Sequence, residues 1–571
     1  MNFKCKFLTL FVPALMLASA THTYAAKPPN ILLIVADDLG YSDIQPFGGE
    51  INTPNLQKLT EKGTVFNNSY SGPTCSITRS MLLTGNDNHQ AGIGTMTEFI
   101  QPEHKGKPGY EGYLNQRVIS LAEILQQKGY FTLMSGKWHL GNGDDSNPNA
   151  KGFKHAFALM PGGAAHFDDS AMFPTKVKKP IYFENGTPYT LPEQFYSSNF
   201  FTDKFLSYLK NDRNKDQPFF GYLAFTAPHW PLQAPDKDIQ KYENFYKDGY
   251  EAIRKSRLER MVKMGLVDQK TKINNPLQNM LPNWDDLTED QKREQMKIMQ
   301  VYAAMIDNMD QNIGRVIDHL EETGELDNTL ILFTSDNGAE GSIPKSMGVN
   351  AFPRGLQEWV DTTFDNSVEN IGHKGSYATL GPQWAQVSST PLPFFKSIVS
   401  QGGIKVPTII RYPKLTAKNK LKTDTVHLMD FVPTVLDLLS IEAPKTRNNE
   451  PLLKMEGTSF LPVLKNKKMK RNAIGWEFNN SKALVKDQWF VQQQNFPFGT
   501  GQWQLFNLDN DPTLLNNLAD KEPKKVKKMV AEWNNYAKRV GVVEAPIRYT
   551  YGQLICFYDT CIEPDHLKNI K

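Results

Sequence analysis

The segment Asn30–Ala36, with the sequence NILLIVA, is a short run that is apolar after its first residue and ends at Asp37 and Asp38. An uninterrupted stretch of Ile, Leu and Val is typical of a central strand in a sheet that is covered on both faces. Polar residues directly after such a strand lie at its carboxyl end, where open α/β sheets bind ligands. The segment therefore predicts a buried central strand followed by two carboxylates.

Strand-like and helix-like segments alternate along the next four hundred or so residues. Strands are predicted at 131–135, 219–225, 329–334 and 407–412. Helices are predicted from Thr53-Pro54 to Gly63, from a capping box at Ser120 and Glu123 to Gly129, from a capping box at Thr288 and Gln291 onward, and after 412 as far as Leu438. This order indicates an α/β fold, with a large mixed, mostly parallel sheet sandwiched by helices.

The pattern changes at about residue 441. Segments 473–478, 484–491 and 504–508 predict short antiparallel strands, and a helix is expected near 523–540. We therefore expect a large domain over residues 27–440 and a smaller C-terminal α+β domain over residues 441–571.

Residues 1–26 have the layout of an export signal. Lys4 and Lys6 precede an apolar stretch from 7 to 18, and Tyr24-Ala25-Ala26 supplies small residues for cleavage. The stretch is too short to span a bilayer, and a buried core helix, the alternative, fits this terminal position poorly. We expect a signal peptide over 1–26 and a periplasmic or secreted mature protein.

Charge and composition exclude several classes of protein. The formal net charge is +3 over 571 residues, and loss of the two signal lysines would lower it to +1 (3 minus 2). A nearly neutral chain lacks the electrostatic footprint of a nucleic-acid-binding protein, and the basic run 465–471 is better explained as a solvated loop. No later segment is apolar enough to predict a membrane span.

Cysteine usage singles out Cys75. Cys5 leaves with the signal, whereas Cys556 and Cys561 lie close together near the C-terminus, where a disulfide is expected in an oxidising compartment. Cys75 is then unpaired, in polar Ser/Thr/Arg surroundings just before a short apolar helix that ends at Thr84-Gly85. A helix N-terminus offers backbone N–H groups to an anion, although a buried and inert cysteine is the commoner alternative.

Polar residues also follow the other predicted strands. Lys137 and His139 follow 131–135, His229 follows 219–225, and Asp336 and Asn337 follow 329–334. We expect these side chains to converge with the first two carboxylates at one edge of the sheet.

Oxygen donors predominate among these residues. Asp37, Asp38, Asp336 and Asn337 suit a hard cation such as Ca²⁺ or Mg²⁺. Either pair alone would suit a turn or a helix cap at least as well. The two histidines are candidates for acid–base roles, although a single histidine in such a turn is more often structural.

Several segments, in order, resemble the formylglycine-dependent sulfatases of the alkaline-phosphatase superfamily, and bacterial arylsulfatases most closely. These segments are NILLIVADDLGYSD, CSITRSMLLTG, GKWHLG, APHWPLQAP, SDNGAEG, SQGGIKVP and WQLFNLDNDP. The resemblance covers nearly the whole mature chain. It implies an alkaline-phosphatase-like sheet, a sulfatase catalytic domain over 27–440, and hydrolysis of sulfate esters to an alcohol or phenol and inorganic sulfate.

In that family a formylglycine-generating enzyme oxidises a cysteine to formylglycine (3-oxoalanine), and the hydrate of this aldehyde is the nucleophile. The resemblance implies that Cys75 is the modified residue and that Arg79 holds it. It implies one Ca²⁺ ion, bound by Asp37, Asp38, Asp336, Asn337 and the modified Cys75. Sulfate would be bound by Lys137, His229 and Lys396, the last placed by its spacing to Gly402-Gly403. His229 would protonate the leaving group, and His139 would take a proton from the sulfated diol to expel sulfate.

One departure from the family pattern bears on the modification. The family has Cys-x-Pro-x-Arg, with Ala tolerated in the central position, whereas this chain has Ile77 there. The maturing enzyme binds the motif as an extended segment, which proline favours. Ile77 thus supports an alternative, a non-catalytic binder of sulfated ligands that keeps the Cys75 thiol.

Two further points stay open at this stage. A phosphonate or phosphate monoester hydrolase on the same fold is another alternative, whereas a two-zinc phosphatase site would need more histidine ligands. We also expect the segments around His166 and His373 to line the mouth of the pocket, where the small sulfated substrate would bind.

Overall fold

The computed structural model describes residues 1, 27–174, 181–347, 356–416, 420–546, 555–558 and 560–562. The predicted signal peptide, apart from Met1, lies outside the described residues. Within the described ranges, no helix is both long enough and apolar enough to cross a membrane.

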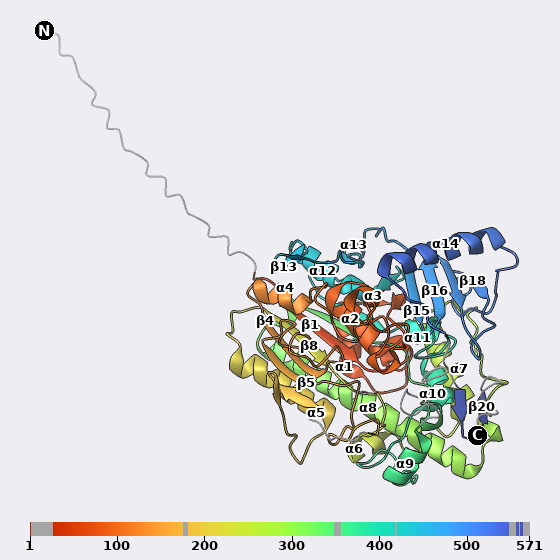
Figure 1. The fold of residues 1–571 in the computed structure, drawn as a ribbon. Coiled ribbons are helices and arrows are strands. Elements are labelled where there is room, and N and C mark those ends of the chain that lie inside the picture. Colours follow the sequence, from red (N-terminus) through yellow and green to blue (C-terminus); the bar gives the residue numbers. More distant parts are fainter. Residues whose placement is uncertain are drawn as a thin grey trace.

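A ten-stranded mixed sheet forms the centre of the molecule (Figure 1). Its strands lie in the order β11-β2-β10-β9-β1-β8-β4-β5-β6-β7. Their bounds are β1 Asn30–Ala36, β2 Gly63–Phe66, β4 Phe131–Lys137, β5 His155–Leu159, β6 Tyr182–Glu184, β7 Thr187–Pro188, β8 Phe219–Ala224, β9 Thr329–Ser335, β10 Thr408–Arg411 and β11 Lys420–Lys422. The strands from β9 to β5 run parallel, and β10 is antiparallel to both of its neighbours. The predicted sheet is confirmed.

Strand β1 explains why the sheet is covered on both faces. Leu32 and Ile34 belong to one hydrophobic core, and Ile31, Leu33 and Val35 belong to the other. All five side chains are fully buried. Because complete burial of such a side chain contributes about 1.5–3 kcal/mol, this alternation requires helices on each side of the sheet.

Helices cover each face accordingly (Figure 1). One core includes α1 (Pro54–Glu61), α5 (Ser197–Ser207) and the long α8 (Glu289–Glu322). The other includes α2 (Cys75–Thr84), α4 (Leu121–Gln127) and α12 (Phe431–Leu438). The predicted capping boxes at the starts of α4 and α8 are present.

The remaining elements are short or peripheral. The helices are α3 Asn88–Ala91, α6 Asp236–Ile239, α7 Gly249–Lys263, α9 Gln357–Thr363, α10 Gly381–Ser388, α11 Gln401–Ile404 and α13 Leu461–Leu464. The small ladders pair β3 Ser69–Tyr70 with β12 Val426–His427, β13 Thr446–Arg447 with β14 Glu450–Pro451, and β19 Ile555–Phe557 with β20 Thr560–Ile562.

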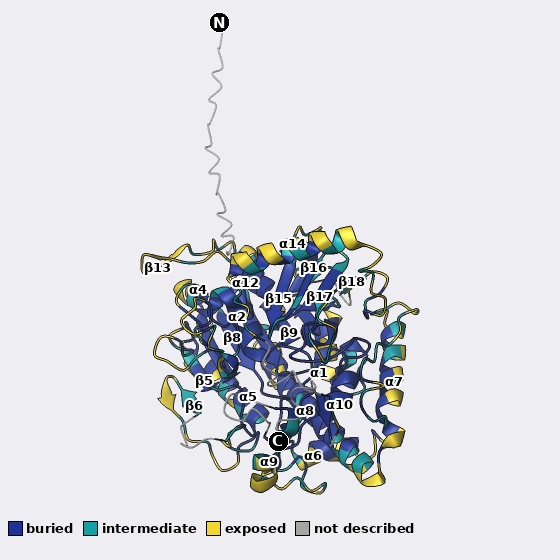
Figure 2. Ribbon diagram, turned by 45° about the vertical axis from the view of Figure 1, so that its right-hand side comes forward, coloured by how far each residue is buried: buried dark blue, intermediate teal, exposed yellow. Residues whose placement is uncertain are grey.

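The C-terminal region contains a four-stranded antiparallel sheet packed against one helix. The strands are β15 Ile474–Phe478, β16 Ser481–Lys486, β17 Trp489–Gln493 and β18 Trp503–Asn507, and the helix is α14 Pro523–Val540. Figure 2 shows that α14 keeps one face against this sheet and exposes the other. The predicted small antiparallel sheet and helix are confirmed, whereas the domain boundary at residue 440 stays a prediction.

The prediction of a single strand over 484–491 was wrong. This segment contains the end of β16 and the start of β17, which form a hairpin that pairs Lys486 with Trp489. The backbone reverses at Asp487, whose φ of 52° is left-handed. Asp tolerates this conformation, but Asp-Gln is a weaker turn signal than Asn-Gly or Asp-Gly.

The C-terminal hairpin returns to the large domain. Cys556 and Cys561 form the expected disulfide across β19 and β20. Next to it, the Tyr558 hydroxyl donates to Glu294 Oε2 at 2.8 Å, at the start of α8. The disulfide therefore closes a short loop that packs on the N-terminal turns of the longest helix.

A buried charged cluster joins the small sheet to the large domain. His89 Nδ1 lies 2.8 Å from Asp87 Oδ1, and His89 Nε2 lies 3.6 Å from Glu477 Oε2 on β15. The Tyr536 hydroxyl of α14 donates to Asp87 Oδ2 at 2.8 Å. Burial alone would lower the pKa of His89, but the two carboxylates outweigh it and raise this pKa to about 9. His89 is therefore a buried cation at neutral pH.

This cluster predicts a loss of stability at alkaline pH. The pKa of His89 is raised to about 9 in the folded protein from an ordinary value of 6.5, so its contribution is complete below pH 6.5 and is lost as the pH rises through about 9. The shift corresponds to about 3 kcal/mol. Urea unfolding between pH 6 and 10 measures the free energy of unfolding of the wild type and of His89→Gln. The difference between these two free energies should shrink as the pH rises. A difference that is independent of pH would contradict the assignment.

Candidate active site

The predicted site residues lie together at the carboxyl edge of the central strands. Asp37 and Asp38 follow β1, and Asp336 and Asn337 follow β9. Lys137 is the last residue of β4, which extends two residues beyond the predicted end at 135, and His229 lies beyond β8. Cys75 and Arg79 come from the first turns of α2. All of these side chains are buried.

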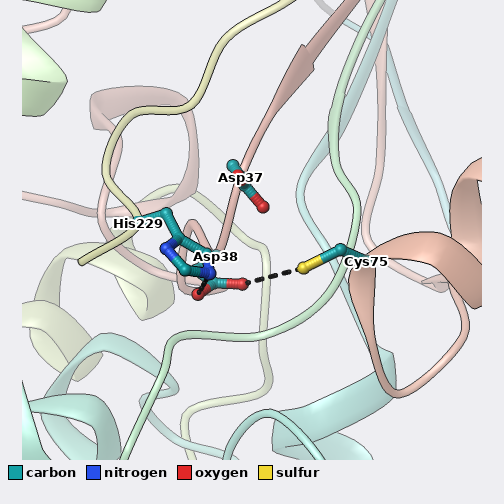
Figure 3. Close-up of side chains that lie close together, drawn as sticks. All are labelled: Asp37, Asp38, Cys75 and His229. Carbon is teal, nitrogen blue, oxygen red and sulfur yellow. Dashed lines mark hydrogen bonds and ion pairs between the residues drawn. The ribbon is translucent and has the colours of Figure 1, made fainter. Parts of the chain in front are cut away.

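Cys75 is the first residue of α2 and points toward Asp38 (Figure 3). Its thiol donates to Asp38 Oδ1 at 3.7 Å, and it is the one free cysteine among the described residues. Burial, followed by the nearby Asp336, raises the pKa of the Cys75 thiol well above its ordinary value. Ile77, two residues later, packs into the core beneath the helix and against Gly72, where a Cβ atom would lie only 2.5 Å from Ile77 Cγ2.

Arg79 joins three elements below the thiol. Its Nε and Nη2 each lie 2.8 Å from Asp336 Oδ2, and its Nη1 donates to the Lys137 carbonyl and the Tyr222 hydroxyl at 3.1 Å each. Nη2 also lies 3.6 Å from Asp37 Oδ1. Although burial alone would lower it, these neighbours raise the pKa of Arg79. Arg79 thus fixes the first turn of α2 to the ends of β4, β8 and β9.

Two lysines contact the first pair of carboxylates. Lys137 Nζ donates to both Asp37 oxygens, at 2.9 and 2.7 Å. Lys396 Nζ donates to Asp38 Oδ2 at 2.8 Å and lies 3.2 Å from Glu340 Oε2. Burial opposes ionisation of Asp38, but the positive charge of Lys396 outweighs it and lowers the pKa of this carboxyl.

The loop that carries Lys396 is held by close backbone contacts. Lys396 N donates to Ala339 O, and Ser397 N donates to Pro73 O, each at 2.9 Å. Gly402 packs behind the loop, because a Cβ atom there would lie 2.0 Å from Phe394 O. The glycine motif that placed Lys396 in the sequence therefore has a steric basis.

The two histidines differ in their surroundings. His229 Nδ1 lies 2.6 Å from Trp230 O, and since a carbonyl can only accept, Nδ1 carries the proton. His229 Nε2 is then unprotonated and lies 3.5 Å from Asp38 Oδ2 (Figure 3). His139 Nε2 lies 3.9 Å from Glu98 Oε1. Burial lowers the pKa of both rings, so both are neutral at ordinary pH.

The donor set fits a hard cation. One ligand atom each from Asp37, Asp38, Cys75 and His229 lies within 4.8 Å of the others. Asn337 Oδ1 is buried and has no hydrogen-bond partner among the described residues, while its amide nitrogen donates to Asp38 Oδ1 at 2.7 Å. A buried carbonyl oxygen without a donor, beside carboxylates, is what an oxygen-coordinated ion would satisfy. Asp336 is bonded instead to Arg79 and to Asp38 N, so its role as a ligand stays a prediction.

A cavity of about 940 Å³ opens above these groups. Cys75, His139, His229 and Lys396 contribute to its lining. Its walls are largely apolar and include Met96, Phe99, Phe173, Trp230, Trp359 and Phe364.

The predicted mouth segments line this cavity, but the two histidines do not. Gly162, Gly163 and Gly375 are in the lining, together with 169–174. His166 is instead buried against the His229 carbonyl, and His373 Nε2 lies 3.1 Å from Asp236 Oδ1. The sequence predicted the position of these segments, but not the directions in which the side chains of His166 and His373 point.

Three polar residues of the site were missed. Glu340 contacts Lys396, and it lies in the same SDNGAEG segment as Asp336, three residues after Asn337, so that segment offered a signal. Tyr222 lies inside β8, where a strand tyrosine is normally core, and Glu98 lies in a short 3₁₀ turn with no motif around it.

Comparison with known proteins agrees with this geometry. The family model described as sulfatase matches residues 29–441, and that described as N-sulphoglucosamine sulphohydrolase, C-terminal, matches residues 393–539. An uncharacterized sulfatase of Schizosaccharomyces pombe is 41% identical over 540 residues, which cover 91% of this chain and 95% of that protein. The arylsulfatase of Klebsiella aerogenes is 40% identical over 462 residues, which cover 81% and 97%.

A solved structure shares the fold. Ps i-CgsB in complex with k-i-k-neocarrahexaose superimposes with a TM-score of 0.63 at 24% identity, covering 89% of this chain and 93% of that one. The family match spans well over half of the chain, and the two relatives are matched over nearly their whole length. The chain therefore belongs to the sulfatase family and is a sulfuric ester hydrolase.

Proposed function

We propose that this sulfatase cleaves its ester with a formylglycine made from Cys75 and with one bound calcium ion. The observation that carries the proposal is the position of Cys75. It starts α2 at the cavity, its Sγ lies 3.7 Å from Asp38 Oδ1, and the cavity lining also contains His139, His229 and Lys396. A nucleophile at residue 75 would therefore meet both the cation-binding carboxylates and the acid–base groups.

Formylglycine would supply a hydroxyl nucleophile, and calcium would supply a divalent positive charge, which no unmodified side chain carries. The hydrated aldehyde of formylglycine provides a hydroxyl nucleophile on a side chain that is otherwise a thiol. Asp37, Asp38, Asp336 and Asn337 would hold a calcium ion, which would supply positive charge to offset the charge of the sulfate group.

The charges of the buried site favour binding of the calcium ion before the sulfate ester. Among the buried residues around Cys75, four carboxylates outnumber three cations, which gives a net charge of −1 when all are ionised; these residues are Asp37, Asp38, Asp336 and Glu340 with Arg79, Lys137 and Lys396. Half-buried Glu98, beside His139 in the cavity wall, adds a further carboxylate. A divalent cation would add two positive charges and offset this excess of negative charge. A sulfate monoester carries one negative charge, so it would be bound only after the cation.

The chain's own residues would divide the remaining work. On binding of the ion, Lys137 and Lys396 would turn from the carboxylates to the sulfate oxygens. His229 lines the cavity, and its Nε2 would take up a proton from solvent when the anionic ester binds, because a nearby negative charge favours the imidazolium; it would then give this proton to the leaving oxygen. His139, whose ring is neutral, would accept a proton from residue 75 when sulfate leaves.

The apolar cavity walls favour an apolar alcohol. Trp230, Trp359 and Phe364 each lie in the lining, within an aromatic cluster that also includes Tyr377. Such walls suit the flat faces of a phenol or the chain of an alkyl sulfate. The name of the Klebsiella relative, an arylsulfatase, agrees with this interpretation.

Maturation would take place during export. The signal peptide over 1–26 would direct the chain to the periplasm or beyond, and a formylglycine-generating enzyme would bind the segment around Cys75 before it folds. In the folded protein Cys75 and Ile77 are both buried, so conversion has to precede folding.

Conversion of Cys75 is tested on protein from its native host. Mass spectrometry of the peptide that contains residue 75 should show formylglycine, and the purified enzyme should hydrolyse 4-nitrophenyl sulfate. Cys75→Ala should lose at least about a thousandfold in kcat, because it lacks the nucleophile. Ile77→Pro is the matched variant and should convert at least as completely.

An unmodified thiol in every molecule, together with binding of a sulfate ester but no turnover, would support the non-catalytic binder instead. Full activity in Cys75→Ala would exclude residue 75 as the nucleophile.

Calcium binding is tested by chelation. Enzyme treated with EDTA should be inactive, and added Ca²⁺ should raise its Tm, because the ion binds only the folded site. Asn337→Ala should weaken Ca²⁺ affinity at least about tenfold in calorimetric titration, which matches the loss of one oxygen ligand. Asn30→Ala, at the opposite end of β1, is the control and should bind Ca²⁺ as the wild type does. Equal affinity in all three proteins would contradict the assigned ligand.

The cavity wall is tested with Trp359→Ala. This change should raise KM for 2-naphthyl sulfate about tenfold and leave kcat within about threefold, because it removes apolar contact and no reacting group. Trp489→Ala, on the C-terminal sheet, is the control. An unchanged KM, or faster turnover of glucosamine 6-sulfate than of any aryl sulfate, would contradict an apolar alcohol.

A further inference from the structure

His166 is a buried histidine to which the proposed mechanism gives no role. It lies in the loop after β5, is 1% exposed, and does not line the cavity. Its ring contacts the backbone of His229, the residue proposed to protonate the leaving group. Burial lowers the pKa of His166 to about 4, so the ring is neutral under ordinary conditions.

Hydrogen bonds fix the tautomer of this ring. His166 Nε2 lies 3.0 Å from the His229 carbonyl oxygen, which can only accept, so Nε2 carries the proton. His166 Nδ1 is then an acceptor and lies 2.7 Å from Ser197 Oγ, at the start of α5. Ser197 Oγ in turn accepts from Thr226 Oγ1 at 3.3 Å. The chain of donors runs from Thr226 through Ser197 and His166 to His229.

The backbone of His166 is held as firmly as its ring. Its N–H donates to Gln233 Oε1 at 2.8 Å, and its carbonyl accepts from Ser197 N at 2.9 Å. Gln233 Nε2 donates to Ser376 O at 2.9 Å. His166 is therefore anchored to α5 and to two loops that do not include its own segment.

The contact matters because of how His229 is itself held. His229 N donates to Thr226 O at 2.9 Å, and its Nδ1 donates to Trp230 O at 2.6 Å. Both partners belong to the turn that contains His229. Among the described residues, His166 Nε2 is the side-chain donor to the His229 carbonyl and comes from outside that turn. Rotation of this peptide would move the imidazole relative to Asp38 and to the bound ester.

We propose that His166 is a positioning residue, which holds the His229 imidazole where Nε2 can protonate the leaving oxygen of the ester. The inference rests on the proposed function, in which His229 is the proton donor. His166 itself touches neither the substrate nor the reacting atoms.

A positioning role of this kind has a specific kinetic consequence. The oxygen of 4-nitrophenol leaves readily as an anion and needs little protonation, whereas the oxygen of phenol is more basic and depends on the acid. Displacement of His229 should therefore slow the hydrolysis of phenyl sulfate more than that of 4-nitrophenyl sulfate. A general loss of folding or of binding would slow both esters by the same factor.

The experiment compares kcat/KM for the two esters in each enzyme preparation. The ratio is independent of the fraction of molecules that are folded or carry formylglycine, so incomplete maturation does not affect it. In His166→Phe, which lacks the donor, the ratio of 4-nitrophenyl to phenyl sulfate should rise about tenfold, within the range attributed to general acid catalysis.

Two variants serve as controls. His166→Gln keeps an N–H donor of similar reach, and its ratio should return to within about threefold of the wild type. Tyr196→Phe removes a neighbouring hydrogen bond, from Tyr196 OH to Gln233 O at 3.1 Å, without touching His229, and should leave the ratio unchanged.

The outcomes separate the inference from the proposed function. An unchanged ratio in His166→Phe, with phenyl sulfate still hydrolysed by the wild type, would overturn the role of His166 alone. An equal rise in Tyr196→Phe would also overturn it, because the effect would then come from general loosening. Failure of the wild type to hydrolyse either ester would instead refute the proposed function.

Discussion

Compensation of buried charge at the end of β1 and β9 is the constraint on which the rest of the site depends. Asp37, Asp38 and Asp336 lie on the carboxyl edge of a sheet that is apolar on both faces, so each requires a cation. Arg79 pairs with Asp336, Lys137 pairs with Asp37, and Lys396 pairs with Asp38. Removing one partner of such a buried pair costs about 3–5 kcal/mol, which explains why separate elements must meet here.

The same constraint shapes the backbone around the site. Asp38 and His139 both have left-handed backbones, with φ of 66° and 58°, directly after central strands. Such conformations are unfavourable outside glycine and persist where the surroundings fix them. Here they direct the Asp38 carboxylate toward Cys75 and Lys396, and the His139 imidazole toward the cavity. The small C-terminal sheet adds a further layer, joined to the large domain through the buried cluster at His89.

Site residues could be predicted from the sequence where a local pattern, such as a buried strand, directly precedes them. The central strands are apolar because both faces are buried, so the polar residues after them stood out, and Asp37, Asp38, Asp336 and Asn337 were found in this way. Cys75 was found because it is the cysteine left without a partner in the mature chain and because it lies just before a predicted helix. Lys396 has no such pattern, and only resemblance to the family indicated it; its loop is set by close contact with Gly402.

Other features depended on tertiary packing that no local pattern contains. Glu340 and Tyr222 are ordinary residues of a loop and a strand until Lys396 and Arg79 are placed beside them. The segment around His166 was expected at the cavity mouth and contributes to its lining, but the His166 ring faces the backbone of His229, because side-chain direction in an irregular loop has no period. The hairpin within 484–491 was missed because its turn residues are weak signals.

The central claim is that these buried charges are arranged around a modified Cys75 and a calcium ion, and a crystal structure of enzyme from its native host tests it most directly. The account predicts an oxygen-bearing side chain at residue 75 and an ion about 2.3–2.6 Å from oxygens of Asp37, Asp38, Asp336 and Asn337. Lys137 and Lys396 should then face the cavity. A thiol at residue 75, with both lysines still bonded to the carboxylates and no ion between them, would contradict it.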